Sequence, residues 1–254
     1  MDKDLKYIGK YTSELNNKEK QDFLYLFNLV FNLNYNMKWF NWKYLDNIYG
    51  DSYIVLVYHR DRIIGIRSFW RNDIDGLLSY QPCDTAVLSE YRGRGIFSQM
   101  SKIALKELEG SFIYNFPNEN SLPGNLKLGW KIHKEYHIKP IWNKSRLKSE
   151  AKFIEDSYLL WKFYNSPLNK YYYYERNGEI YLLYKRRQNL YYVLGKFNEE
   201  NKKYFTKAKN PILFNHTGGE TLMHKLLKKS TTIVSYGNGS FQNIDVPIFK
   251  ADYF

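Results

Sequence analysis

The spacing of hydrophobic and polar positions changes several times along the chain, and each change marks a predicted element. Between residues 17 and 34, apolar side chains recur every three to four positions, which is typical of an amphipathic helix. The runs 52–58 and 62–70 are rich in β-branched and aromatic residues and are separated by the turn-prone His59-Arg60-Asp61, which indicates a hairpin. Residues 77–88 then predict one further strand.

The pattern switches from strand to helix after residue 88. A loop with two glycines, Arg92-Gly93-Arg94-Gly95, is followed by apolar residues at helical spacing from Phe97 to Leu108, and Gly110 ends the run. Residues 112–116 form a short apolar run of strand type. The order strand, loop, helix, strand predicts a βαβ unit with a parallel pair of strands.

Residues 130–138 alternate with a period of two, which predicts another strand. His133 and His137 therefore face the same way on a strand, whereas a spacing of four brings side chains together only on a helix. The order His-Glu-x-x-His of zinc-binding helices is also absent. We expect no metal site here.

A second part of the chain echoes the first. Trp161-Lys162-Phe163 resembles Trp42-Lys43-Tyr44, and each is followed by a strand, a turn and a strand. This shared order favours a duplication, in which the second copy has no counterpart of the glycine loop. We expect an α/β (α+β) fold with a mixed sheet flanked by helices, divided into domains at residues 1–145 and 146–254. Apolar positions of the second half that need a partner surface are Leu182, Leu183, Tyr191, Val193 and Leu194.

Composition fits a folded protein. Of 254 residues, 44% are hydrophobic and 19% aromatic, whereas disordered chains are poor in aromatic residues. The N-terminus has no signal-peptide pattern, and no stretch approaches the roughly 20 apolar residues that span a bilayer. The single cysteine, Cys83, fits a reducing compartment. We therefore expect a cytoplasmic protein without a membrane span; nothing in the sequence indicates its oligomeric state.

The formal charge of +12 leaves two interpretations open: a solvated basic surface, or attraction of anionic cofactors and substrates. Basic residues are scattered, with only short clusters such as Lys185-Arg186-Arg187, which argues against nucleic acid as a partner.

The loop Arg92-Gly93-Arg94-Gly95 has the properties of an anion site. Glycines let backbone N–H groups converge on a phosphate, and the following helix adds its positive dipole end. Arg92 and Arg94 can add charge-assisted contacts. The Gly-Lys-Ser/Thr ending of a P-loop and the Rossmann fingerprint are both absent.

The stretch from Ala86 to Phe97 resembles motif A of the GNAT N-acetyltransferases, Arg/Gln-x-x-Gly-x-Gly/Ala. Arg92 and Gly95 match, whereas Phe97 replaces the last small residue. Leu126-Lys127-Leu128-Gly129-Trp130 is similar to a later Leu-Gly-Phe segment of the family. The segment Phe116-Pro117-Asn118-Glu119-Asn120-Ser121 is similar to one in a bacterial subgroup associated with surface-polysaccharide genes.

The resemblance implies a GNAT-like first half, a degenerate GNAT-like second half and acetyl-CoA as co-substrate. The strand ending at Val87 and Leu88 would part from residues 112–116 to receive the pantetheine arm, and the backbone of Val87 and Leu88 would contact that arm. Pyrophosphate would bind the backbone of Arg92, Gly93, Arg94, Gly95, Ile96 and Phe97. Asn118 and Asn120 would contact the pantetheine or the acceptor.

The same resemblance implies the transfer of an acyl group from a thioester to an amine. Candidate general bases are Asp84 and Glu119. Asn125 occupies the position where the family has a tyrosine as general acid, and an amide is a poor proton donor. Cys83 is interpreted as a buried structural residue rather than an acyl carrier.

The resulting functional hypothesis is an N-acetyltransferase acting on a small-molecule amine, such as an amino sugar or a nucleotide-linked amino sugar, that is anionic. Two alternatives stay open. One is a Fem-type aminoacyltransferase that uses aminoacyl-tRNA, favoured by the duplication and the basic charge. The other is a non-catalytic protein that binds acyl-CoA, which the missing tyrosine permits.

Overall fold

The chain folds into two compact units. The computed structural model describes residues 4–141, 147, 151–217, 230–237 and 243–252. The first unit comprises Met1–Lys131 and Val234–Ile244, and the second comprises Ile132–Ile233 and Asp245–Phe254. The chain thus returns to the first unit after building most of the second. A division into contiguous domains at residue 145 stays a prediction.

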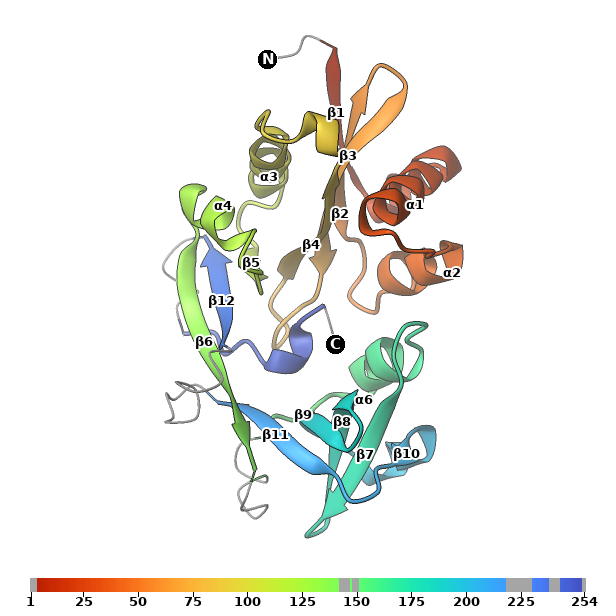
Figure 1. Ribbon diagram of the computed structural model, residues 1–254, viewed down its shortest axis with the longest axis vertical. Coiled ribbons are helices and arrows are strands. Elements are labelled where there is room, and N and C mark those ends of the chain that lie inside the picture. Colours follow the sequence, from red (N-terminus) through yellow and green to blue (C-terminus); the bar gives the residue numbers. More distant parts are fainter. Residues whose placement is uncertain (1–3, 142–146, 148–150, 218–229, 238–242, 253–254) are drawn as a thin grey trace. The chain divides into compact units, whose positions relative to one another are not determined.

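The first unit is a mixed sheet with helices (Figure 1). Its strands are β1 (Leu5–Tyr11), β2 (Tyr53–His59), β3 (Arg62–Arg71), β4 (Ser79–Val87), β5 (Phe112–Asn115) and the end of β12 (Ser230–Tyr236). Its helices and helical turns are η1 (Thr12–Glu14), α1 (Asn17–Phe31), α2 (Met37–Phe40), the π-type turn η2 (Asn41–Leu45), η3 (Ser89–Tyr91), α3 (Ile96–Glu107) and α4 (Leu122–Lys127). Helices α3 and α4 lie on one side of these strands and α1 and α2 on the other.

Helix α1 forms where the apolar periodicity predicts it. Asn16 caps its first turn in a reciprocal pair with Glu19, and Asn32 ends it in the left-handed conformation. Phe23 on its buried face packs against Phe40 and Tyr44, with ring centroids 5.4 Å and 5.6 Å apart. This aromatic packing fixes the η2 turn, which carries Lys43 and Tyr44.

The predicted hairpin and βαβ unit are both confirmed. Strands β2, β3 and β4 form an antiparallel meander, and β4 pairs in parallel with β5 across α3. The strand order is β1-β2-β3-β4-β5-β12, and β12 is antiparallel to β5. Only β12 comes from the far end of the sequence.

The second unit repeats this arrangement. Its strands are β6 (Lys131–Pro140), β7 (Tyr171–Arg176), β8 (Glu179–Arg187), β9 (Leu190–Phe197), β10 (Thr206–Lys207) and β11 (Ile212–Thr217). Its helical segments are α6 (Asp156–Tyr158), the π-type turn η5 (Leu159–Tyr164), η6 (Glu199–Tyr204) and η8 (Ile248–Lys250). Strands β7, β8 and β9 form a meander, β9 is parallel to β11, and β11 is antiparallel to β6.

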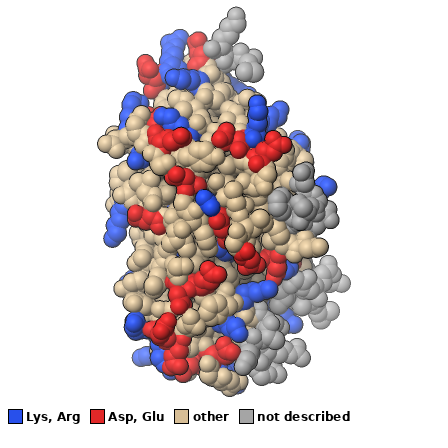
Figure 2. Space-filling model, turned by 180° about the vertical axis from the view of Figure 1, so that it is seen from behind, with Lys and Arg blue, Asp and Glu red and all other residues tan. Residues whose placement is uncertain are grey.

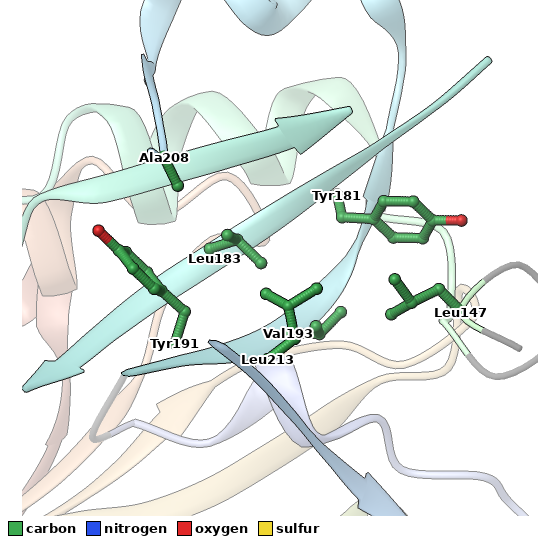
Figure 3. Close-up of a cluster of buried hydrophobic side chains, with 7 residues drawn as sticks. All are labelled: Leu147, Tyr181, Leu183, Tyr191, Val193, Ala208 and Leu213. Atoms are coloured by element: carbon green, nitrogen blue, oxygen red, sulfur yellow. The ribbon is translucent and has the colours of Figure 1, made fainter. Parts of the chain in front are cut away.

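The echo in the sequence corresponds to matching elements. Trp42-Lys43-Tyr44 lies in the π-type turn η2 before β2, and Trp161-Lys162-Phe163 lies in the π-type turn η5 before β7. The apolar positions that needed a partner surface are all buried. A core cluster of the second unit consists of Leu147, Tyr181, Leu183, Tyr191, Val193, Ala208 and Leu213 (Figure 3). The two-half architecture is therefore confirmed.

Within the described part of the chain, no helix is long and apolar enough to cross a bilayer. On the face shown in Figure 2, acidic and basic side chains are interspersed rather than gathered into one basic patch. This agrees with the scattered basic residues of the sequence.

Candidate active site

The glycine loop joins β4 to α3 in a conformation that requires its glycines. Gly93 and Gly95 have φ angles of +76° and +78°, a region that side-chain-bearing residues rarely adopt. Gly95 is the N-cap of α3 and provides no side-chain cap to the first-turn N–H groups. Ile96 and Phe97 begin this twelve-residue helix. The turn therefore offers unsatisfied N–H groups and a positive dipole end to an anion.

The two arginines of the loop are exposed and brace its backbone. Arg92 Nε donates to the Val87 carbonyl oxygen at 3.0 Å, and Arg94 donates to the Glu90 carbonyl oxygen at 3.0 Å. The Leu88 N–H donates to Ile64, and its carbonyl accepts from Tyr91. A role of Leu88 in binding pantetheine stays a prediction. For its N–H to bind that arm, the hydrogen bond from this N–H to Ile64 on β3 must first break.

Strands β4 and β5 separate as β4 runs toward this loop. Their parallel pairing covers Ser79 with Phe112 and Tyr80 with Ile113, whereas β4 continues to Val87 and β5 to Asn115. Beyond these pairs the two strands are not paired with each other. The sequence resemblance predicted such a separation for an extended ligand, and a ligand at this place stays a prediction.

A β-bulge interrupts the pairing of β4 with β3. Ile66 pairs with Ala86 and Ser68 with Cys83, so Arg67 on β3 faces two residues, Asp84 and Thr85. Asp84 has a φ angle of +45°. A bulge re-aims side chains and is common beside active sites. Here it turns Asp84 toward the α1 and α2 side.

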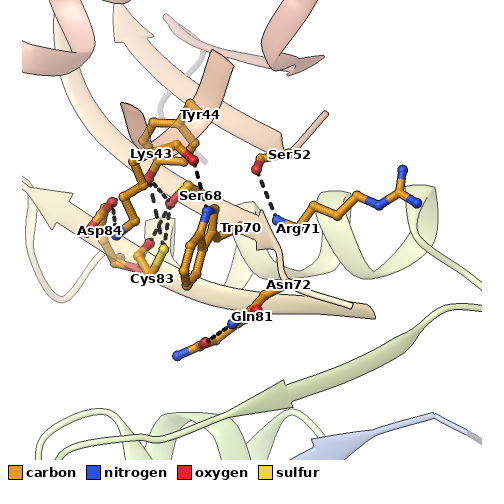
Figure 4. Close-up of polar contacts among 11 residues, drawn as sticks. Lys43, Tyr44, Ser52, Ser68, Trp70, Arg71, Asn72, Gln81, Cys83 and Asp84 are labelled. Carbon is orange, nitrogen blue, oxygen red and sulfur yellow. Dashed lines mark hydrogen bonds and ion pairs between the residues drawn. The ribbon is translucent and has the colours of Figure 1, made fainter. Parts of the chain in front are cut away.

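Asp84 belongs to a buried polar cluster (Figure 4). Its carboxylate pairs with Lys43 Nζ at 2.8 Å and accepts a hydrogen bond from Tyr44 Oη. Tyr44 Oη also lies 2.7 Å from Ser68 Oγ. Burial, followed by the charge of Asp84, holds the pKa of Tyr44 well above its usual range, so Tyr44 stays protonated as a donor. The candidate base is thus held by two partners inside the fold.

Cys83 is part of the same cluster. Its Sγ atom lies 3.2 Å from Ser68 Oγ, and the residue is buried. This environment agrees with a structural cysteine.

The segment after β5 places the other candidates at the surface. Asn118 Oδ1 accepts from the N–H groups of Asn120 and Ser121 at 3.1 Å and 2.9 Å, which shapes the turn into α4. Asn118, Glu119 and Asn120 are exposed. Their roles toward the cofactor or acceptor stay predictions.

Asn125 lies in α4 and is fully buried, at 0% exposure. Its Oδ1 and Nδ2 atoms and the Nε1 atom of buried Trp130 have no hydrogen-bond partner within the described residues. Trp130 is adjacent, since its N–H donates to the Asn125 carbonyl. Leaving such groups unpaired costs about 1–3 kcal/mol each. In the α4 segment that follows β5, these groups could pair with a polar ligand such as the pantetheine of CoA.

Phe97, in the first turn of α3 after the glycine loop, lies against α4. A Cβ atom added at Gly124 would lie 3.2 Å from the Phe97 ring, so α4 packs directly on the first turn of α3. The large Phe97 is accommodated because the facing residue is glycine. The departure from motif A at Phe97 is therefore compensated by Gly124 in α4.

A cavity of about 690 Å³ lies at the other end of α3, between residues such as Lys102, Lys106 and Lys127. None of the predicted cofactor residues lines it. It is distinct from the glycine loop at the start of α3.

Sequence reasoning missed Lys43, Tyr44 and Arg67 as residues of this site. Two of them had a visible signal in the sequence. Lys43 is a charge enclosed by aromatic residues and repeated as Lys162, and Arg67 is a charge inside an apolar strand.

Solved structures resemble the chain over nearly its whole length. A probable N-acyltransferase from Enterococcus faecalis has 14% identity and a TM-score of 0.59, and covers 91% of this chain and 72% of its own. A GCN5-related N-acetyltransferase from Kribbella flavida has 10% identity and a TM-score of 0.55, with coverages of 91% and 71%. One from Anabaena variabilis has 11% identity and a TM-score of 0.54, with coverages of 90% and 72%.

The chain has the GNAT fold. No family model matches its sequence, and comparison with curated proteins gives no match either. At these identities the likeness concerns the fold, and chemistry must be argued from the residues.

Proposed function

We propose that this GNAT-fold chain is an acyl-CoA-dependent N-acyltransferase that moves an acetyl group from acetyl-CoA to the amine of a small molecule. The observation that carries the proposal is the parting of β4 from β5 directly before an uncapped helix N-terminus. An extended arm with a pyrophosphate at one end matches both features. The orphaned polar groups of Asn125 and Trp130 support a ligand at this place.

The backbone from Gly93 to Phe97 would hold the pyrophosphate, and the β4 edge at Val87 would align the arm. When bound, the cofactor supplies the thioester from which the acyl group leaves. The chain's part is to hold the two reactants in line, which by itself accounts for much of the rate of such reactions. Asp84 and Glu119 are the proposed proton acceptors. Asn125 would position rather than protonate, because its amide is a poor acid.

For the acceptor we propose an anionic small molecule, with an amino sugar or a nucleotide-linked amino sugar as the leading class. The formal charge of +12 and the resemblance at Phe116-Pro117-Asn118-Glu119-Asn120-Ser121 to a surface-polysaccharide-associated subgroup support this class. The single cysteine supports a cytoplasmic setting.

A second candidate, a non-catalytic acyl-CoA-binding protein, is favoured by Asn125 at the position of the family's acid. The repeated strand arrangement favours a Fem-type aminoacyltransferase, but the glycine loop argues against it because aminoacyl-tRNA does not require a pyrophosphate turn. Release of CoA from acetyl-CoA in the presence of amines identifies the acetyltransferase. Thermal protection by acetyl-CoA without such release indicates the binding protein, and the absence of both results favours the Fem-type enzyme.

The test of cofactor binding compares two glycines with the same backbone conformation. Gly95→Glu places a carboxylate in the loop, whereas Gly178→Glu places one at the β7–β8 turn, and both positions have positive φ with open space around an added Cβ. We expect acetyl-CoA to raise the melting temperature of wild type and Gly178→Glu but not of Gly95→Glu. Equal protection of all three proteins would contradict the loop assignment.

A further inference from the structure

Arg67 is a buried cation on the α3 side of the first unit. It is 3% exposed, and its Nη1 donates to Thr85 Oγ1 at 3.0 Å. Its guanidinium carbon lies 4.3 Å from the centroid of the Phe97 ring and 5.3 Å from that of Phe69. Its Nε atom has no hydrogen-bond partner among the described residues. The Nε–H donor of the guanidinium is therefore unsatisfied within the described residues.

Other buried cations of the chain have strong acceptors. Lys43 pairs with Asp84, and Lys162 donates to two main-chain carbonyls at 2.6 Å. Arg67 has no ion pair within the described chain, although its pKa, lowered by burial to about 10, still leaves it charged at neutral pH. Buried charges are normally paired, because desolvation penalises an isolated one. The missing partner points to an anion that arrives with a ligand.

The surroundings of Arg67 indicate where that anion lies. Thr85 belongs to the β-bulge of β4, and Phe97 lies in the first turn of α3. Arg67 thus lies beneath the start of α3, near the place where β4 and β5 separate and where the acyl group and the acceptor would meet. The pyrophosphate has the backbone amides of the loop, so a different anionic group is required here.

We propose that Arg67 binds a carboxylate of the substrate, so that the transferase takes a carboxylate-bearing acyl group or a carboxylate-bearing amine. This inference rests on the proposed function. The planar guanidinium packs near the rings of Phe97 and Phe69, and a carboxylate that reached its buried Nε–H would satisfy this donor in a geometry that a guanidinium favours. The carboxylate belongs either to a dicarboxylic acyl group on CoA or to an amino-acid-like acceptor.

Binding measurements on the full chain separate these two sources. Calorimetric titrations would compare succinyl-CoA with acetyl-CoA, and amino acids with the amines that lack only the carboxylate, such as alanine with ethylamine. The amines are titrated with and without CoA. The variants are Arg67→Lys, which keeps the charge but loses the planar fork, and Arg67→Met, which removes the charge.

We expect one carboxylate ligand to bind wild type at least tenfold more tightly than its neutral counterpart. Arg67→Met should abolish this preference and Arg67→Lys should reduce it, while acetyl-CoA binding changes less than twofold. Preference for succinyl-CoA identifies the donor as the source, and preference for the amino acid identifies the acceptor. The melting temperature of ligand-free Arg67→Met should stay equal or rise, because an unpaired buried charge has been removed.

A wild-type chain that binds carboxylate and neutral ligands alike would overturn the inference. So would an Arg67→Met variant that melts well below wild type and keeps the preference, because Arg67 would then be structural. Failure to bind any CoA thioester would instead overturn the proposed function, and the amine titrations without CoA would still decide the role of Arg67.

Discussion

Each unit has two parallel strands that pair over only a few residues, and the units differ in what lies beyond that pairing. In the first unit, β4 pairs with β5 only at Ser79 and Tyr80, and the orphaned groups of Asn125 and Trp130 lie in the adjoining α4 segment. In the second unit, β9 pairs with β11 only from Leu190 to Tyr192.

Beyond Tyr192 the chain itself fills the edge of β9. Lys196 N–H donates to the Lys152 carbonyl oxygen, and Ile154 N–H donates to the Lys196 carbonyl oxygen, both at 2.8 Å. Phe153 forms a parallel bridge with Lys196. The edge of β9 that could bind an extended ligand is therefore occupied by residues 152–154. The β9 edge of the second half is therefore filled by the chain's own residues, whereas the corresponding edge of β4 in the first half is the one that we propose for a ligand.

The buried lysines of the two π-type turns also contact different groups. Lys43 pairs with the Asp84 carboxylate, whereas Lys162 Nζ donates to the carbonyl oxygens of Phe249 and Ala251. The π-type turn with a buried lysine is repeated, and in the half with the glycine loop this lysine pairs with a carboxylate.

The largest effect is expected from removing these lysines. Lys43→Met leaves the Asp84 carboxylate buried without its cation, which costs about 3–5 kcal/mol. Lys162→Met leaves two carbonyl groups without this donor, at about 1–3 kcal/mol each. Urea unfolding measures both. Lys18→Met, which removes the pair of an exposed lysine with Asp22 and its contact with the Tyr58 ring, should change stability by about 1 kcal/mol or less. A loss at Lys43 no larger than that at Lys18 would contradict a buried ion pair with Asp84.

Acid should destabilise the second unit through His216. This residue lines a cavity of about 270 Å³ beside Val193 and Leu194, and burial lowers its pKa to about 4. Between about pH 6.5 and 4 the unfolded chain binds a proton that the folded chain does not, so stability is present above this window and falls within it. The loss amounts to about 3 kcal/mol at the lower end. Comparing urea unfolding of wild type and His216→Phe across this range tests it, and parallel pH profiles would rule His216 out as the source.

Gly195 should be required for residues 152–154 to pack against β9. A Cβ atom there would lie 2.7 Å from both the Ile154 side chain and the Lys152 carbonyl oxygen. Gly195→Ala should cost about 1–3 kcal/mol and increase tryptic cleavage after Lys152, because residues 152–154 are displaced. Gly65→Ala in β3, where the closest side-chain atoms are 3.3 Å away, is the matched control with the smaller loss. Unchanged cleavage in Gly195→Ala would show that residues 152–154 are not held by this contact.

The smallest effect is expected at Asn125. Because its amide has no partner within the described chain, Asn125→Leu should change the stability of the ligand-free protein by less than about 1 kcal/mol while weakening acetyl-CoA protection. The buried Asn201 of the second unit donates to Asp156 at 2.7 Å, so Asn201→Leu should cost about 1.5–3 kcal/mol. A loss at Asn125 as large as that at Asn201 would indicate a structural role instead.

The sequence by itself determined the local elements of this protein. The apolar spacing of α1, the β2–β3 hairpin, the glycine loop before α3 and the echo of Trp42 in Trp161 were readable because each depends on neighbours within a few positions. Helical and strand periodicities, and glycines at positive φ, are properties of short segments.

Only the tertiary structure decided which distant residues meet. The pairing of β12 with β5, the Lys43–Asp84 pair, the stacking of Arg67 on Phe97 and the filling of the β9 edge by residues 152–154 join positions tens to more than a hundred residues apart. No short-range pattern encodes such partners, because they follow from strand register and from the bulge that sets where each side chain points.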